Sequence, residues 1–183
     1  PNPAPSPLIL SPGGGEGRVR GRQVGVLTVS DVVVAGAAGR MGCRVIACLA
    51  DAPDLTLVGA LEAPGHAALG RDAGEVAGIG RHGGSVTADP PAVLTRDRIL
   101  VEFSIPEATL EHLRVVARGG GRAVIGTTGF TAPQREEIAR LAETVPILVS
   151  PNMSVGVNLA FKLLAQMAQT LGDEYDVEIT EIH

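Results

Sequence analysis

Residues 32–42 read Val-Val-Val-Ala-Gly-Ala-Ala-Gly-Arg-Met-Gly, and this stretch decides the fold. Its first four residues, Val32–Ala35, are apolar and mostly β-branched, which is typical of a strand buried on both faces. Glycines follow at positions 36, 39 and 42, and a helical pattern then runs from about residue 40 to residue 50. A buried strand, a glycine turn and a helix in this order predict the first unit of a dinucleotide-binding fold.

The residue types in this turn suit a pyrophosphate. One glycine makes the tight turn, a second lets the backbone approach the ligand, and the third lets helix and strand pack closely. The start of the helix offers free N–H groups and a partial positive charge to an anion. A glycine turn that only packs the helix against the strand is the alternative interpretation.

Glu62 stands at the end of the second predicted strand, residues 55–61, about 20 residues after Gly42. A carboxylate there can accept hydrogen bonds from both hydroxyl groups of the adenosine ribose. Ala63 follows, where a 2′-phosphate would want Arg or Lys, and Glu62 would repel that phosphate. Glu62 and Ala63 together favour NAD(H) over NADP(H), and Arg40 is the candidate residue for accommodating NADP(H).

Strands and helices alternate along the rest of the chain, which predicts an α/β fold of the Rossmann type, with a doubly wound parallel sheet. Capping boxes at Ser104–Glu107 and Thr131–Gln134 predict helix starts, and residues 63–84 read as a long surface loop. Apolar residues recur every four positions over 155–171, which predicts an amphipathic helix. Further strands are predicted at 24–29, near 86, and at 100–103, 123–125, 147–149 and 176–182.

Composition narrows the classes of function. The 183 residues are 45% hydrophobic but only 2% aromatic, and the net charge is −5. Without a Lys/Arg cluster, a long apolar span or a secretory leader, we expect no nucleic-acid or membrane partner and a cytoplasmic location. The spacing of Cys43 and Cys48 on one helix predicts buried free thiols rather than a disulfide or a metal pair, and no metal site is expected.

The two ends of the chain are unusual. Residues 1–30 are rich in Pro and Gly, and we expect a disordered or non-native tail there. Residues 31–152 are predicted to form the dinucleotide-binding domain. Because the chain begins at Pro1 and ends at His183, directly after a strand-like run, we expect a fragment. His66, His82 and His112 lack partner spacing and are interpreted as surface residues.

Six segments, taken in order, carry a resemblance to a known family: VAGAAGRMG (34–42), ALE (60–62), VEFSIPE (101–107), VIGTTGF (124–130), SPNMSVGVN (150–158) and VEITEIH (177–183). They are similar to the 4-hydroxy-tetrahydrodipicolinate reductases, also called dihydrodipicolinate reductases, of lysine and diaminopimelate biosynthesis. The family usually has Asp where Glu102 stands, and some members have Ala where Pro151 stands.

The resemblance implies a reductase that transfers a hydride from NADH or NADPH to a cyclic dicarboxylate and gives tetrahydrodipicolinate. It implies a homotetramer and a substrate domain, α+β in character, of which residues 153–183 are the truncated beginning. His183 matches the first histidine of the family's acid/base pair, while the second histidine, a lysine and a Ser-Gly-Thr loop follow later in the family. The cofactor residues it implies are Gly36, Ala37, Ala38, Gly39, Arg40, Met41, Glu62, Gly126, Thr127, Thr128, Ser150, Pro151, Asn152 and Met153.

Two other functions remain open at the level of sequence. One is another NAD(P)-dependent dehydrogenase, acting on an amino acid or a semialdehyde. The other is a non-catalytic dinucleotide-binding module. We expect the 183-residue chain to be inactive alone, because the acid/base residues that the resemblance implies are incomplete.

Overall fold

The computed structural model describes residues 8–10 and 29–180 of the chain. Contacts divide these residues between two compact units. One unit comprises Pro7–Pro151, and the other contains Asn152–His183. Residues 24–28 of the predicted strand 24–29 and the predicted catalytic residue His183 lie outside the described residues, and Val29 is not in a strand.

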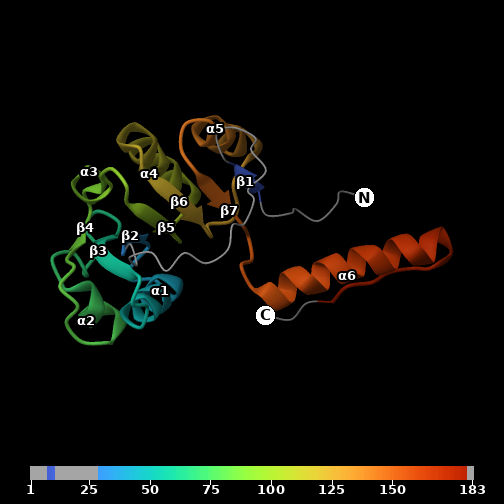
Figure 1. Ribbon diagram of the computed structural model, residues 1–183, viewed down its shortest axis with the longest axis horizontal. Coiled ribbons are helices and arrows are strands. Elements are labelled where there is room, and N and C mark those ends of the chain that lie inside the picture. Colours follow the sequence, from blue (N-terminus) through green and yellow to red (C-terminus); the bar gives the residue numbers. More distant parts are fainter. Residues whose placement is uncertain (1–7, 11–28, 181–183) are drawn as a thin grey trace, which may run out of the picture. The chain divides into compact units, whose positions relative to one another are not determined.

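The first unit is built on one sheet of seven strands in the order β1-β7-β6-β5-β2-β3-β4 (Figure 1). All neighbours from β2 to β7 are parallel, and β1 pairs antiparallel with β7 at the edge. The strands are β1 (Leu8–Leu10), β2 (Ser30–Ala35), β3 (Leu55–Leu61), β4 (Val86–Thr87), β5 (Ile99–Glu102), β6 (Arg122–Ile125) and β7 (Ile147–Val149). The predicted α/β fold of the Rossmann type is confirmed.

β2 lies between β3 and β5, so the chain winds first to one side of β2 and then to the other. Ala35 pairs with Leu61 on one side and with Glu102 on the other, which brings the ends of the three strands together. In an open parallel sheet the crevice at such a reversal is where ligands bind. The fold therefore places the glycine turn, Glu62 and the segment after Glu102 at one edge.

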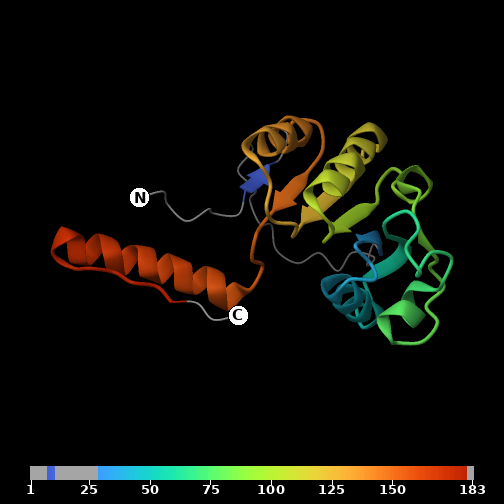
Figure 2. The same cartoon turned by 180° about the vertical axis from the view of Figure 1, so that it is seen from behind.

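Helices cover both faces of the sheet (Figures 1 and 2). Successive residues of β2 point to opposite faces. Val33 packs in a core with residues of α4 and α5, and Val34 packs in a second core with residues of α1 and α2. The helices of this unit are α1 (Arg40–Ala50), α2 (Ala73–Ala77), α3 (Pro90–Val93), α4 (Pro106–Gly119) and α5 (Ala132–Ala142).

Residues 63–84 differ from the predicted loop, because they contain the short helix α2. Asp72 organises this segment: its carboxylate accepts hydrogen bonds from the amides of Gly74, Glu75, His82 and Gly83 at 2.8–3.2 Å. These backbone hydrogen bonds, that from His82 foremost, lower the pKa of Asp72 from 3.8 to about 2. The Asp72 side chain thus connects the start of α2 to a turn about ten residues later, and no local sequence pattern predicts this contact.

The two predicted capping boxes have different outcomes. At α5 the box is present, with Thr131 accepting from the amide of Gln134 and the Gln134 side chain accepting from that of Thr131. At α4 the prediction is wrong: the N-cap is Ile105, one residue later than expected, and it makes no side-chain cap. The amide of Ser104 instead donates to the Glu102 carboxylate at 2.9 Å.

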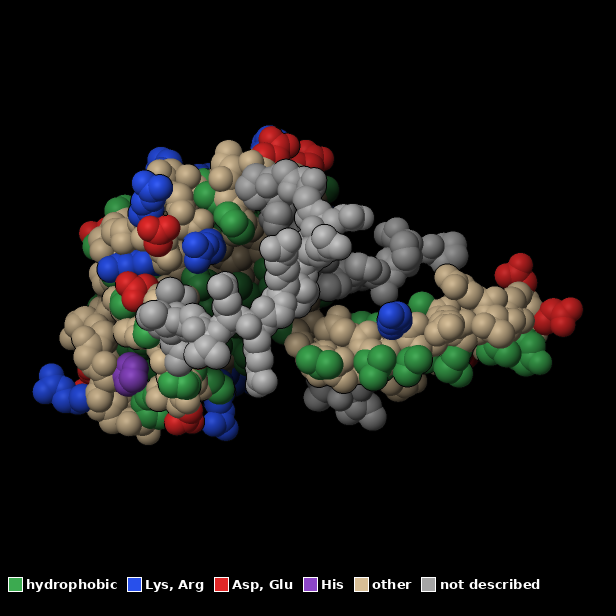
Figure 3. All heavy atoms as spheres, in the orientation of Figure 1, with side chains coloured by type: hydrophobic (Ala, Val, Ile, Leu, Met, Phe, Trp, Pro, Cys, Tyr) green, Lys and Arg blue, Asp and Glu red, His purple; other side chains and the backbone are tan. Residues whose placement is uncertain are grey.

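The second unit contains the predicted amphipathic helix, α6 (Val155–Leu171), and a short 3₁₀ turn at Gly172–Glu174. Within this unit its apolar residues are uncovered and form a row along the helix (Figure 3), with Leu159 at 54%, Leu163 at 50% and Met167 at 57% exposure. The predicted strand at 176–182 is wrong for residues 176–180, which have no regular structure. None of the helices that the structure describes combines the length and the hydropathy of a membrane span.

Two smaller expectations also change. Residues 8–10, within the segment expected to be a disordered or non-native tail, form the strand β1. The expectation that both cysteines are buried is wrong: Cys43 is half-buried and Cys48 is exposed, and both are free.

Candidate functional site

The glycine turn is held by close backbone contacts. Gly36 has φ +70°, and a Cβ atom there would lie 2.5 Å from the carbonyl oxygen of Phe103. A Cβ at Gly42 would lie 2.1 Å from the carbonyl oxygen of Gly36. Both positions therefore require glycine, the first for its backbone angle and both for lack of space. Gly39, the N-cap of α1, has no side chain to cap the helix, so the first amides of α1 have no side-chain partner from the cap.

The Glu62 carboxylate spans the end of β3 and the glycine turn. Its Oε2 accepts from the amide of Ala38 at 3.0 Å, and its Oε1 accepts from the amide of Ala63 at 3.0 Å. Each carboxylate oxygen has a second lone pair, so both can still accept from hydroxyl groups of a ligand. The two hydrogen bonds fix the acid beside the turn.

A cavity of about 820 Å³ opens at this edge of the sheet. The glycine turn and Glu62 form part of its wall, and the first turns of α4 form another part. Its lining residues are Gly36, Ala38, Gly39, Leu61, Glu62, Ala63, Pro64, His66, Ala88, Pro90, Phe103, Ser104, Ile105, Glu107, Ala108, Glu111, His112 and Arg114. A volume of this order is typical of a site for a cofactor-sized ligand.

Among the predicted turn residues, Gly36, Ala38 and Gly39 line the cavity. Ala37 is buried in the core. Arg40 and Met41 are exposed on the first turn of α1 and do not line the cavity. A pyrophosphate contact through their backbone amides therefore stays a prediction.

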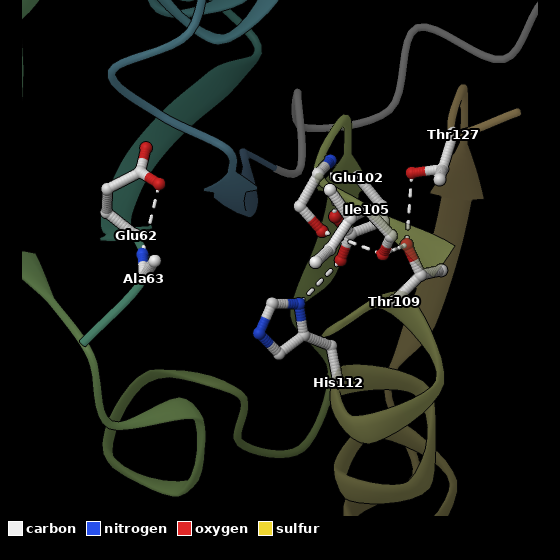
Figure 4. A network of polar contacts seen from close by, with 8 residues as sticks. Glu62, Ala63, Glu102, Ile105, Thr109, His112 and Thr127 are labelled. Atoms are coloured by element: carbon white, nitrogen blue, oxygen red, sulfur yellow. Dashed lines mark hydrogen bonds and ion pairs between the residues drawn. The ribbon is translucent and has the colours of Figure 1, made fainter. Parts of the chain in front are cut away.

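Glu102 and His112 form a buried pair of side chains at this edge of the sheet (Figure 4). Glu102 is fully buried at the end of β5, and its Oε2 lies 2.6 Å from Nδ1 of His112 on α4. Its Oε1 accepts from the amide of Ser104. The expectation that His112 is a surface residue without a partner is wrong: the residue is 8% exposed and lines the cavity.

A second polar contact links α4 to the segment after β6. Thr109 lies within hydrogen-bond distance of both the Ile105 carbonyl, at 2.9 Å, and the Thr127 hydroxyl, at 3.0 Å (Figure 4). Thr127 is buried and its hydroxyl faces α4. Thr128 is exposed and Gly126 packs against the Phe103 ring. Gly126–Thr128 do not line the cavity at Glu62.

The remaining predicted cofactor residues fall on both sides of the division between the units. Ser150, which is buried, and Pro151 end the first unit, and Asn152 and Met153 begin the second. In the second unit the Asn152 side chain accepts from the amide of Ser154, and Asn158 donates to the Asn152 carbonyl at 2.8 Å. These hydrogen bonds stabilise the start of α6, which accounts for the polar residues in the Asn152–Asn158 run.

The α4 wall of the cavity was missed by the sequence analysis. Ala108 follows the N-cap Ile105 by three residues, and Glu111 and His112 follow Ala108 by three and four residues, so these residues lie on one side of the start of α4. The spacing of these residues after a predicted strand was the available signal. It does not indicate whether this face of the helix contacts a ligand or solvent. Among the described residues, no three His, Cys, Asp or Glu side chains are grouped in a way that could hold a metal ion.

Comparison with known proteins gives consistent matches. A family model described as "Dihydrodipicolinate reductase, N-terminus" matches residues 30–153. A 4-hydroxy-tetrahydrodipicolinate reductase of Citrifermentans bemidjiense is 47% identical over 152 residues, which cover 83% of this chain and 57% of that protein. One of Geobacter sulfurreducens is 45% identical over 155 residues, which cover 85% and 58%. The chain thus spans little more than half the length of the curated relatives it matches.

Solved structures agree on the fold. A dipicolinate-bound dihydrodipicolinate reductase from Paenisporosarcina sp. TG-14 superimposes with a TM-score of 0.60 at 20% identity, covering 75% of this chain and 53% of that chain. A structure described as a putative NADPH-dependent oxidoreductase from Desulfitobacterium hafniense gives a TM-score of 0.54 at 18% identity, covering 79% and 40%. At these identities the likeness concerns the fold alone.

Proposed function

Because the chain belongs to the dihydrodipicolinate reductase family, we propose that it carries the dinucleotide-binding part of a 4-hydroxy-tetrahydrodipicolinate reductase. The observation that carries the proposal is the joining of Glu62 to the glycine turn through the amide of Ala38 at 3.0 Å, at the wall of one cavity. This arrangement presents a carboxylate for ribose hydroxyl groups beside a backbone that a pyrophosphate can approach.

In the proposed complex the glycine turn, with Gly36 and Gly39 on the wall of the cavity, holds the pyrophosphate. Glu62 accepts from the ribose hydroxyls of the adenosine half. On the strength of the family resemblance, Gly126, Thr127 and Thr128 are proposed to line the nicotinamide end, and Ser150, Pro151, Asn152 and Met153 are proposed to complete the cofactor site. When bound, the reduced nicotinamide would supply a hydride, which together with a proton would reduce the cyclic dicarboxylate to tetrahydrodipicolinate.

The acid/base role proposed for His183 also rests on the resemblance alone. The same holds for the homotetramer and for the cytoplasmic location. Light scattering coupled to size-exclusion chromatography tests the assembly, which we expect to be tetrameric only when the rest of the family's substrate domain is present.

Calorimetric titration of the 183-residue chain with NADH tests the binding proposal. We expect Glu62→Gln to weaken NADH binding about tenfold, because the amide side chain loses the charge that the two ribose hydroxyls favour. Glu143→Gln, an exposed change at the end of α5, is the matched control and is expected to change nothing. Equal affinity of the Glu62 variant and the unchanged chain would contradict the proposed site.

Turnover is tested in a chimera that joins this chain to the remaining part of the C. bemidjiense relative. The expected result is oxidation of NADH or NADPH that depends on the cyclic dicarboxylate substrate. A chimera that binds dinucleotide and leaves this substrate unchanged would favour the other functions left open by the sequence.

The preference between the two cofactors is proposed to be for NAD(H). Ala63 is small and exposed beside Glu62, so this wall offers a 2′-phosphate no Arg or Lys at that position. We expect Ala63→Arg to improve NADPH binding about tenfold with little change for NADH, because a guanidinium is then available to the extra phosphate. Tighter binding of NADPH than of NADH by the unchanged chain would overturn the preference.

A further inference from the structure

The segment that follows β6, residues 126–129, is held by contacts on its inner side. The amide of Gly126 donates to the carbonyl of Glu102 on the neighbouring strand β5 at 2.9 Å. Thr127 is buried, with 6% exposure, whereas Thr128 and Gly129 after it are exposed. The Thr127 side chain therefore anchors the segment to the protein, and the next two residues lie on its outer side.

The partner of Thr127 is a hydroxyl group on α4. The Oγ1 atom of Thr109, which is fully buried, lies 3.0 Å from the Thr127 hydroxyl and 2.9 Å from the carbonyl oxygen of Ile105 (Figure 4). A carbonyl can only accept, and a hydroxyl has one proton to donate. Both hydrogen bonds are therefore made when Thr109 donates to the Ile105 carbonyl and accepts from the Thr127 hydroxyl.

Thr109 is a fixed point for this contact because the helix holds it. Its backbone amide donates to the same Ile105 carbonyl at 2.9 Å, as part of the first turn of α4. Ile105, the N-cap of this helix, lines the cavity that Glu62 also lines. One buried hydroxyl group thus connects the cavity wall to the segment after β6, and a side chain on a rigid helix positions a loop more precisely than another loop does.

We propose that Thr109 is a positioning residue for the nicotinamide end of the cofactor site: its hydroxyl holds Thr127, and Thr127 fixes the backbone of the segment that meets the cofactor. The inference rests on the proposed function, which assigns Gly126–Thr128 to the nicotinamide end. Thr109 is buried and does not line the cavity, so it acts through Thr127. Without the Thr109 hydroxyl the buried Thr127 hydroxyl loses this partner, and the segment must move for it to find another.

The experiment compares NADH with ADP-ribose, which has the same adenosine, pyrophosphate and second ribose but lacks the nicotinamide. Calorimetry on the 183-residue chain is expected to show about tenfold tighter binding of NADH, because only NADH contacts the segment through its nicotinamide. Thr109→Val, which is similar in shape and lacks the hydroxyl, should bring the ratio of the two dissociation constants close to one and leave the affinity for ADP-ribose unchanged. Thr109→Ser keeps the hydroxyl and should keep the ratio.

Thr170→Val is the matched control. The Thr170 hydroxyl donates to the carbonyl of Gln166, four residues earlier, at 2.9 Å, which is the same kind of hydrogen bond on an exposed helix. This variant should keep the full ratio. If circular dichroism shows that Thr109→Val does not fold, Thr127→Val takes its place, because Thr109 then keeps the Ile105 carbonyl as its partner. Thr127→Val should also bring the ratio close to one.

The ratio is the readout because a general loss of structure weakens both ligands alike and leaves the ratio unchanged. A folded Thr109→Val or Thr127→Val variant that keeps the ratio would overturn this inference. The same holds for a Thr109→Ser variant that loses the ratio, and for an unchanged chain that binds NADH and ADP-ribose equally. Failure of the unchanged chain to bind either ligand would overturn the proposed function itself.

Discussion

The helices α4 and α6 have the same kind of sequence pattern and opposite surroundings. In α4 the apolar side chains Leu110, Leu113 and Val116 are 0–6% exposed and pack in a core with the sheet. In α6 the apolar side chains Leu159, Leu163 and Met167 are 50–57% exposed within their unit. An apolar stripe therefore predicts a helix with one buried face, but the stripe does not indicate which surface buries that face.

The largest expected effect concerns the packed side of this comparison. Gly36→Ala should destabilise the first unit by about 4 kcal/mol or more and abolish NADH binding, because the new Cβ meets the Phe103 backbone and φ is positive. Gly70→Ala is the matched control: Gly70 has φ +78° but nothing within 4 Å of a Cβ. It should cost only about 1 kcal/mol. Similar unfolding free energies for the two variants in urea would show that the turn is not closely packed.

The second test applies one substitution to both helices. Leu113→Ala removes a fully buried side chain and should lower the free energy of unfolding by about 3 kcal/mol. Leu163→Ala removes a half-exposed one and should change it by less than about 0.5 kcal/mol. Urea denaturation of the 183-residue chain measures both. A large loss for Leu163→Ala would mean that α6 is packed in this chain, and the comparison would fail.

A smaller effect on stability is expected at the N-caps of two helices, one in each unit, where a hydroxyl side chain caps the helix. Thr131 caps α5 and Ser154 caps α6, each by accepting from an amide three residues later. Thr131→Ala should destabilise the first unit by about 1 kcal/mol, because α5 packs in its core. Ser154→Ala should lower the helix content seen by circular dichroism and leave the unfolding of the first unit unchanged. Loss of stability in both variants would mean that the two units unfold together.

The smallest expected effect is a dependence on pH that belongs to the first unit. The folded pKa of Asp72 is about 2, below its ordinary value of 3.8. Its stabilising hydrogen bonds are therefore fully present above about pH 4 and are lost as the pH falls toward 2. Asp72→Asn should flatten this part of the curve of unfolding midpoint against pH. NMR titration of the unchanged chain should show the Asp72 carboxyl titrating near pH 2, and a midpoint near 4 would contradict the assignment.

Local patterns were sufficient for most of the first unit. The run Val32–Ala35 predicted a buried strand, and the three glycines predicted the turn that follows it. Glu62 was singled out by its standard spacing after the last glycine. Each of these signals is local or has a fixed spacing along the chain. The capping box at Thr131 was read correctly for the same reason. At Ser104 the same kind of pattern failed, because the neighbouring Glu102 carboxylate takes the Ser104 amide.

The features that sequence reasoning missed depend on contacts between distant residues. His112 and Glu102 are ten residues apart on different elements, and their pairing follows from the packing of α4 on the sheet. Asp72 holds a turn ten residues later in a similar way. No periodicity along the chain encodes either contact.

The sequence by itself determined the α/β fold, the glycine turn and its acid, and the family, because backbone sterics and hydrophobic period act over short spans. Only the tertiary structure decided that His112 is a buried, oriented histidine on the wall of the cavity rather than a surface residue. The physical reason is that a side chain's burial and tautomer are set by the groups packed around it. Those groups come together only when β5 and α4 are folded against each other.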